Sequence, residues 1–316
     1  MTRAVAPALS IVVPCYNEEA ALPHASTALL SVLGELVGAG AVRSESAIYF
    51  VDDGSTDRSW TVIEDLARGE PRCHGIKLSR NFGHQHALLC GLLTVPGDAI
   101  ITIDADLQDD VRAMKGMIDA YSSGADVVYG VRAGRPKDSW FKRVTGEGFY
   151  SLARRFGVPL VFNHADYRLL SRRAVTALQE HGERNLFLRG IVPGLGFPSA
   201  SVTYTRRERV AGRSKYPLTK MLAFAIDGIT SFSAVPLQFI TWLGVAVSIG
   251  GVGTAAWAVW IRLFNHTAVP GWTSIVVPMS VLGGIQLFCT GIIGQYLAKI
   301  YLETKGRPRY VIETIV

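Results

Sequence analysis

The chain has 316 residues, of which 49% are hydrophobic and 18% charged, and it carries a formal net charge of +6. Its mean hydropathy of +0.25 is too high for an average soluble domain, and the excess is concentrated near the C-terminus. The four cysteines are widely spaced and form no Cys-x-x-Cys or Cys/His pair, which argues against a disulfide framework or a zinc site.

From residue 9 to about residue 202, short β-branched runs alternate with helical stretches. This pattern predicts an α/β domain with a mostly parallel sheet, in which ligands bind beyond the carboxyl ends of the strands. The predicted strands are Leu9–Val13, Ala47–Val51, Gly75–Leu78, Ala99–Ile103 and Val127–Gly130. The predicted helices are Glu19–Val37, Ser59–Arg68, His84–Leu93, Val111–Ser122, Trp140–Phe156 and Arg172–Gln179.

The first predicted strand leads into Pro14-Cys15-Tyr16-Asn17-Glu18-Glu19, which places polar side chains at the ligand edge. An ordinary strand-to-helix loop with Asn17 as the helix cap is an alternative explanation. The segment lacks the glycines of a GxGxxG loop, which argues against a dinucleotide-binding domain.

The second predicted strand ends in Asp52 and Asp53, followed by Gly54-Ser55-Thr56-Asp57. A turn with a capping box explains Gly54 to Asp57 but not why two acids end an apolar strand. One of the two aspartates is therefore expected to accept a hydrogen bond from a base N–H or a ribose hydroxyl.

The fourth predicted strand delivers Asp104-Ala105-Asp106-Leu107-Gln108 to the same edge. Two carboxylates one residue apart, with an amide close behind, can hold a divalent cation together with the diphosphate that the cation carries. This segment therefore points to nucleotide-sugar chemistry.

Two stretches near the C-terminus, Gly228 to Ile261 and Thr267 to Ala298, contain no Asp, Glu, Lys, Arg or His. Each exceeds the roughly 20 residues that cross a bilayer core, so we expect a hairpin of two transmembrane helices at about 235–262 and 274–298. Basic residues flank the hairpin, which predicts a multi-pass protein of the plasma (inner) membrane with its catalytic domain and both termini in the cytoplasm.

Four regions are predicted: a catalytic domain (1–210), a juxtamembrane segment (211–234), the two membrane helices (235–300) and a cytoplasmic tail (301–316). Within the second region, Pro217 to Ser233 has the pattern of an amphipathic helix at the membrane interface. The positive charge beside the membrane is interpreted as attraction to anionic lipid head groups, so no nucleic-acid partner is expected. We find no cleavable signal peptide.

Taken in order, the three strand-end segments resemble glycosyltransferase family 2, whose corresponding motifs lie on a GT-A fold. Arg80-Asn81-Phe82-Gly83 and Gly212-Arg213-Ser214-Lys215-Tyr216 narrow the resemblance to the polyprenyl-phosphate glycosyltransferases. That group includes bactoprenol glucosyltransferases, dolichol-phosphate mannosyltransferases and undecaprenyl-phosphate aminoarabinose transferases.

The resemblance implies roles for the residues that match its motifs. The donor nucleotide would be held by Pro14, Tyr16, Asn17, Glu19, Asp104 and one of Asp52 and Asp53. A Mg²⁺ or Mn²⁺ ion that bridges the donor diphosphate would be surrounded by Asp104, Asp106 and Gln108, with Asp106 the first choice as a direct ligand.

The acceptor is expected to be a lipid phosphate, whose negative charge must be offset by cations. The candidates are Arg132, Arg143, Arg213 and Lys215, although Arg143 and Lys215 also suit a basic surface. Asp166 matches an acidic position that the family places near the reaction centre. Since a phosphate acceptor is already ionised, we favour an orienting role for Asp166 and place general base second.

The sequence thus predicts an inverting, metal-dependent transfer of a sugar, with a UDP-sugar favoured, to undecaprenyl or decaprenyl phosphate. A non-catalytic nucleotide-binding membrane subunit is an alternative. A processive polysaccharide synthase is disfavoured, because its Gln-x-x-Arg-Trp motif is missing and two spans leave no pore. Glycines in the spans allow close packing into a homo-oligomer, such as the tetramers found among bacterial members.

Overall fold

We describe a computed structural model of the chain, in which residues 5–133, 164–183, 186–205, 235–264 and 271–316 are placed. The chain divides into two compact units. Of the described residues, the first unit holds 5–133, 164–183, 186–205 and 307–316, and the second holds the rest. Each unit is described by itself.

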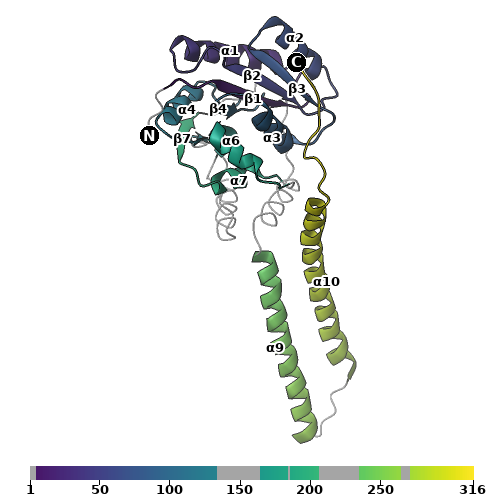
Figure 1. The fold of residues 1–316 in the computed structure, drawn as a ribbon. Coiled ribbons are helices and arrows are strands. Elements are labelled where there is room, and N and C mark those ends of the chain that lie inside the picture. Colours follow the sequence, from purple (N-terminus) through teal and green to yellow (C-terminus); the bar gives the residue numbers. More distant parts are fainter. Residues whose placement is uncertain (1–4, 134–163, 184–185, 206–234, 265–270) are drawn as a thin grey trace. The chain divides into compact units, whose positions relative to one another are not determined.

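The first unit is built on an eight-stranded sheet of order β7-β5-β6-β4-β1-β2-β3-β8 (Figure 1). Its strands are β1 (Leu9–Cys15), β2 (Ala47–Asp52), β3 (Cys73–Leu78), β4 (Ala99–Thr102), β5 (Val127–Arg132), β6 (His164–Ser171), β7 (Ser199–Tyr204) and β8 (Ile312–Ile315). Only β6 and β8 run opposite to the others, so the expected mostly parallel α/β sheet is confirmed.

Strand direction decides which residues share an edge. The carboxyl ends of β1, β2, β4 and β5 lie at one edge of the sheet, and the amino end of the antiparallel strand β6 lies at the same edge. Asn17, Asp52, Asp104, Arg132 and Asp166 are therefore all delivered to that edge by the topology.

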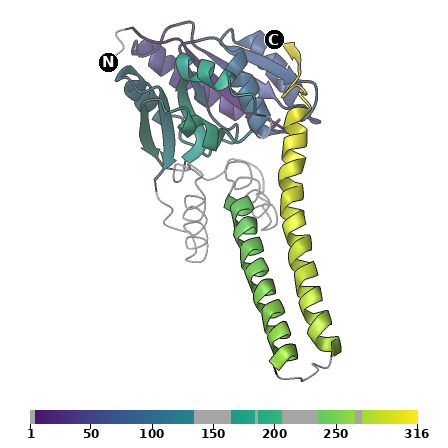
Figure 2. The same ribbon diagram turned by 60° about the horizontal axis from the view of Figure 1, so that its bottom comes forward.

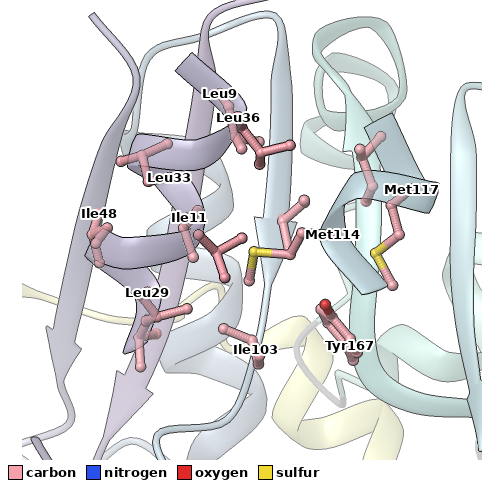
Figure 3. Packing of buried hydrophobic residues seen from close by; sticks show 14 of the residues in the cluster. Leu9, Ile11, Leu29, Leu33, Leu36, Ile48, Ile103, Met114, Met117 and Tyr167 are labelled. Atoms are coloured by element: carbon pink, nitrogen blue, oxygen red, sulfur yellow. The ribbon is translucent and has the colours of Figure 1, made fainter. Parts of the chain in front are cut away.

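The helices of this unit are α1 (Leu22–Gly38), α2 (Ser59–Gly69), α3 (His84–Thr94), α4 (Ala113–Ser122), α6 (Arg172–Gln179) and α7 (Leu188–Gly194). The first five begin and end within three residues of their predicted bounds. In α1, Leu29, Leu33 and Leu36 recur at helical spacing and pack against Ile11 and Ile48 of the sheet (Figure 3).

Three strands were not predicted from the sequence. β6 contains His164, Asp166 and Arg168, and such charged residues are unusual inside a sheet, but Arg168 is only 1% exposed and forms an ion pair with Asp166. β8 follows the apolar helices and belongs to the region expected to be a cytoplasmic tail. It pairs antiparallel with β3 as the edge strand of the sheet.

The second unit contains two long helices, α9 (Val235–Phe264) and α10 (Gly271–Thr304), shown in green and yellow in Figure 2. Large apolar side chains are exposed on both, including Trp242 at 71% and Leu287 at 76%. Of the described residues, only Val281–Thr304 is long and apolar enough to cross a membrane, while the apolar stretch Leu237–Gly253 is shorter. One candidate span is found, and the expected two-helix hairpin is not shown.

Candidate active site

The loops after β1 and β2 are joined by side chains that the sequence analysis assigned to the nucleotide. Asn17 Oδ1 accepts a 2.8 Å hydrogen bond from the main-chain N–H of Thr56, and Glu19 Oε2 accepts one of 3.0 Å from that of Arg58. Pro14 is buried in β1, whereas the Tyr16 side chain, next to the loop, is exposed (45%). Asn17 and Glu19 thus hold the two loops together and leave Tyr16 open to a ligand.

Asp52 and Asp53 are both buried, but their carboxylates accept hydrogen bonds from different segments of the chain. Asp52 accepts long hydrogen bonds, 3.3 and 3.4 Å, from the main-chain N–H of Ser55. Asp53 accepts short ones from Phe82 (2.7 Å) and Gly83 (2.9 Å). Burial raises the pKa of both carboxyls. Asp53 therefore fixes the segment after β3, a role that the sequence did not suggest.

Gly54 is required where these two segments meet. Its φ is +67°, and a Cβ atom built on it would lie 2.4 Å from the carbonyl carbon of Arg80. The segment 80–83, which the sequence analysis noted only as part of a resemblance, is thus packed on the loop after β2. Its Arg80 guanidinium stacks over the Phe82 ring at 4.0 Å.

The loop after β4 holds the two carboxylates expected at a metal ion. Asp104 Oδ1 is buried and, within the described residues, has no hydrogen-bond partner. Asp106 Oδ1 accepts a 3.2 Å bond from the main-chain N–H of Gln108, whose side chain is buried, and Leu107 has a positive φ of 51°. Burial and the nearby carboxylates of Asp166, Asp109 and Asp106 raise the pKa of Asp104, although His84 lowers it.

These residues fit a divalent cation. Hard oxygen donors suit Mg²⁺ and Mn²⁺, and Mg²⁺ is commonly held by one or two carboxylates together with substrate phosphates. A buried carboxylate oxygen without a hydrogen bond from the described residues is the feature that a cation would satisfy. No group of three or more His, Cys, Asp or Glu side chains in the described ranges is arranged as a complete metal site, so phosphate oxygens would have to complete the coordination.

Asp166 is the centre of a network that joins β6, α3 and α7. Its carboxylate is paired with Arg168 and accepts bonds from Arg189 Nε (3.2 Å), Arg189 Nη2 (3.0 Å) and Gln85 Nε2 (3.3 Å). Burial alone would raise its pKa, but the hydrogen bond from His84 and the charges of both arginines hold the pKa well below its usual range. Asp166 is therefore ionised and oriented, which suits the favoured role better than that of a base.

His84 links this network to the loop after β4. Its Nε2 lies 3.5 Å from Asp166 Oδ2 and 3.6 Å from Asp104 Oδ1. Burial disfavours the imidazolium, yet the hydrogen bond to Asp166 and the two negative charges raise the pKa of His84 above its usual value. His84 is thus a charged or readily charged bridge between the two carboxylates.

Arg132, a candidate for binding the acceptor phosphate, is paired with an acid of the protein. Its Nη2 and Nε lie 3.1 and 3.2 Å from Asp109 Oδ1, and Tyr204 donates its hydroxyl to the same oxygen at 2.6 Å. Asp109 is only 2% exposed, so this pair is largely buried. Much of the Arg132 guanidinium is thus committed within the protein.

Sequence reasoning missed several members of the site: Gln85, Asp109, Arg168, Arg189 and Tyr204. Arg168 could have been predicted, because residues two apart in a strand share a face and Asp166 was already a candidate. Arg189 and Tyr204 could not, since only the tertiary fold brings α7 and β7 to this edge. Arg143, Arg213 and Lys215, together with the predicted helices at Trp140–Phe156 and Pro217 to Ser233, lie outside the described residues.

Comparison with known proteins identifies the class. The family model described as "Glycosyl transferase family 2" matches residues 10–178, which contain all of β1 but its first residue, β2 to β6, and every acidic residue of the site. The chain belongs to this family and is a glycosyltransferase. The resemblance noted in the sequence is thereby confirmed, and with it the GT-A-like fold.

Particular relatives cover nearly the whole chain. The uncharacterized glycosyltransferase YkoT of Bacillus subtilis (strain 168) is 45% identical, over 97% of this chain and 91% of the relative. Bactoprenol glucosyl transferase of Shigella phage SfX is 38% identical, over 97% and 99%. Among solved structures, glucosyl-3-phosphoglycerate synthase from Mycobacterium tuberculosis is similar with a TM-score of 0.47 and 22% identity, over 71% of this chain and 78% of that one.

Proposed function

We propose that the protein transfers glucose from UDP-glucose to a polyprenyl phosphate, such as undecaprenyl phosphate, with inversion at the anomeric carbon. The similarity to bactoprenol glucosyl transferase carries the proposal, because it extends over 97% of this chain and 99% of the relative. The alignment therefore includes the site and the apolar helices, the two parts that an enzyme with a lipid acceptor requires.

The donor nucleotide would lie over the loops after β1 and β2. Support comes from the exposed Tyr16 ring, which offers a base a stacking surface, and from the buried carboxylates at the end of β2. Pro14, Asn17 and Glu19 would shape this surface through the contacts between the loops. Of Asp52 and Asp53, Asp52 is the better candidate for a direct nucleotide contact, because Asp53 is engaged by the segment after β3.

The diphosphate and a Mg²⁺ or Mn²⁺ ion would lie beside Asp104 and Asp106, with Gln108 in the same turn. When bound, the ion neutralises charge on the departing nucleoside diphosphate. Oδ1 of Asp104 is buried and accepts no hydrogen bond within the described residues, which supports this placement. Asp106 remains the first choice as a direct ligand.

In the transfer, an oxygen of the lipid phosphate forms a bond to the anomeric carbon while the bond from that carbon to the diphosphate breaks. The electron pair of the broken bond leaves with UDP. A phosphate is already ionised near neutral pH, so no base is needed to remove a proton. The depressed pKa of Asp166 supports a positioning role in this step. Arg132, with Arg143, Arg213 and Lys215, remains a candidate cation for the acceptor.

We further propose that α9 and α10 anchor the enzyme in the inner membrane and that the catalytic unit lies in the cytoplasm. The candidate span Val281–Thr304 supports the anchor. A membrane anchor would keep the site near the head groups, where the acceptor phosphate lies. Assembly into a homo-oligomer, such as a tetramer, belongs to the same proposal.

The test uses purified full-length protein, undecaprenyl phosphate, Mg²⁺ or Mn²⁺, and a panel of radiolabelled nucleotide sugars. We expect label from UDP-glucose to enter the organic phase, and none when undecaprenol replaces the phosphate. Transfer from a different donor would overturn the choice of glucose. Binding of UDP without any lipid-linked product would favour a non-catalytic subunit.

A further inference from the structure

Arg189 lies in α7, outside every segment that the sequence singled out, yet its guanidinium reaches the proposed reaction centre. Its Nε and Nη2 donate to the two oxygens of Asp166, one to each, at 3.2 and 3.0 Å. This side-on pairing fixes the plane of the guanidinium. The Arg189 side chain is still 33% exposed, whereas Arg168, on the same carboxylate, is 1% exposed.

Two arginines meet at the carboxylate of Asp166. Arg168 and Arg189 are both permanently charged and share this one carboxylate, but only Arg189 reaches the surface. A guanidinium that is held in one plane and is still one-third exposed is suited to bind an anion such as phosphate.

The order of the strands indicates on which side of the site Arg189 lies. Along the site edge, the nucleotide loops follow β2 and β1, Asp104 follows β4, and Asp166 lies on β6. Arg189 therefore belongs to the side of Asp104 away from the nucleotide loops. An anion bound there lies on the side away from the donor nucleotide, from which a phosphate that attacks the anomeric carbon opposite the leaving diphosphate must approach.

We propose that Arg189 binds the phosphate group of the lipid acceptor and that Asp166 holds its guanidinium in position for this contact. The proposal rests on the proposed function, from which it takes the acceptor. It adds Arg189 to Arg132 as a candidate acceptor cation among the described residues; both are paired with a buried aspartate, and the Arg189 side chain is 33% exposed against 21% for Arg132. The proposed contact requires the planar guanidinium of arginine and not only its positive charge.

The experiment compares Arg189→Gln and Arg189→Lys with a matched control, Arg173→Gln. Arg173 is also an exposed arginine (64%) paired with a buried aspartate, Asp126, but it lies at the opposite edge of the sheet. For each protein we would measure the KM for undecaprenyl phosphate, the Kd for UDP with Mn²⁺, and the melting temperature. Binding of undecaprenyl phosphate and of undecaprenol, with UDP present, is measured separately by native mass spectrometry.

We expect Arg189→Gln to raise the acceptor KM and weaken undecaprenyl phosphate binding by about 10- to 100-fold, the value of one or two lost charge-assisted hydrogen bonds. Arg189→Lys should recover only part of the loss, and Arg173→Gln should change neither value. UDP affinity and undecaprenol binding should stay within about twofold of wild type, which is close to the error of such measurements.

Two results would overturn the inference. A weaker UDP complex with unchanged acceptor binding would assign Arg189 to the donor diphosphate. A lower melting temperature with both affinities unchanged would make Arg189 purely structural. Because lipid binding is measured without turnover, an inactive wild type would count against the proposed function while the Arg189 result still stands on its own.

Discussion

The carboxylate of Asp53 accepts a 2.7 Å hydrogen bond from the main-chain N–H of Phe82, which joins the end of β2 to the segment after β3. The same carboxylate accepts a 2.9 Å bond from Gly83, the residue before α3. His84 and Gln85, the first residues of α3, are two of the groups that face Asp166. Asp53 therefore supports the reaction centre through the main chain rather than by direct contact.

Replacing Asp53 tests this support. Asp53→Ala removes both acceptors and leaves two main-chain N–H groups without a partner, so we expect a loss of about 3 kcal/mol of unfolding free energy. The melting temperature of the variant measures this loss of stability. The surface variant Asp65→Ala, at a side chain that is 66% exposed, should cost less than about 0.5 kcal/mol. If Asp53 were only a nucleotide contact, UDP affinity would fall while the melting temperature stayed unchanged.

Gly54 and Gly40 have nearly equal φ angles, so substitutions at these two positions distinguish the cost of backbone strain from the cost of steric overlap. Gly54 (φ +67°) and Gly40 (φ +65°) both carry a left-handed backbone, but a Cβ at Gly40 meets nothing within 4 Å. Gly40→Ala should therefore cost about 1 kcal/mol from backbone strain alone. Gly54→Ala adds overlap with the main chain at Arg80 and should cost about 2–5 kcal/mol.

Melting temperatures of the two glycine variants give the comparison, and UDP titration shows whether the loop after β2 is displaced. We expect weaker UDP binding for Gly54→Ala alone. Equal melting temperatures for the two variants would contradict the contact between Gly54 and the segment 80–83.

The strand β8 makes a prediction about the C-terminal residues. Val316 exchanges two main-chain hydrogen bonds with Gly75, at 2.8 and 2.9 Å. Because such pairs alternate along an antiparallel ladder, Thr314, opposite Lys77, bonds to β3, while the N–H of Ile315 points away from it. Thr314→Pro should thus remove a ladder bond and cost about 1–3 kcal/mol, and Ile315→Pro should cost less.

Hydrogen exchange of the β3 amides measures this difference without relying on activity. We expect faster exchange in β3 for Thr314→Pro and near-native exchange for Ile315→Pro. Identical protection in both variants would mean that β8 does not pair in the register observed.

Most of the sheet could be predicted from the sequence, because β1, β2 and β4 are apolar runs that end in polar motifs and α1 has a clear apolar face. β6 could not, since Arg168 and Asp166 pair with each other inside the sheet and hide its apolar pattern. β8 could not either, because pairing between residues 76 and 315 leaves no local signal.

The same distinction between local sequence pattern and tertiary contact applies to the candidate site. The residues at strand ends, such as Asp104, were expected because topology alone brings them to one edge. What each side chain does depends on neighbours distant in sequence: Asn17 contacts Thr56, and Arg132 contacts Asp109. Motif positions were therefore predictable, whereas their partners were not.

Metal dependence can be tested through nucleotide binding rather than turnover. If Asp106 is a ligand, Mn²⁺ should tighten UDP binding in the wild type, and EDTA should remove the gain. Asp106→Ala should show little difference between Mn²⁺ and EDTA, while Asp119→Ala, an exposed acid on α4, should respond like the wild type. Isothermal titration gives both affinities, and a full Mn²⁺ response in Asp106→Ala would exclude Asp106 as a ligand.

The last prediction concerns the charge on Asp166. Its pKa is held well below the usual range, so its ion pairs stabilise the fold fully above the unfolded pKa of about 3.9 and are lost as pH falls toward the folded pKa. Asp166→Asn leaves the buried Arg168 without its anion and should cost about 3–5 kcal/mol at pH 7. Adding Arg168→Met should recover part of that loss, because the unpaired charge is then removed as well.

The difference between wild type and Asp166→Asn should shrink when the pH is lowered from 5 to 3, because in this range the wild-type carboxyl takes up a proton in the unfolded chain while it stays ionised in the folded protein. Thermal unfolding of both proteins at each pH measures this difference in stability. Between pH 6 and 9 the wild-type rate should show no step from Asp166, since a carboxyl with so low a pKa is ionised throughout. A difference in stability that stays constant down to pH 3 would contradict the ion-paired state of Asp166.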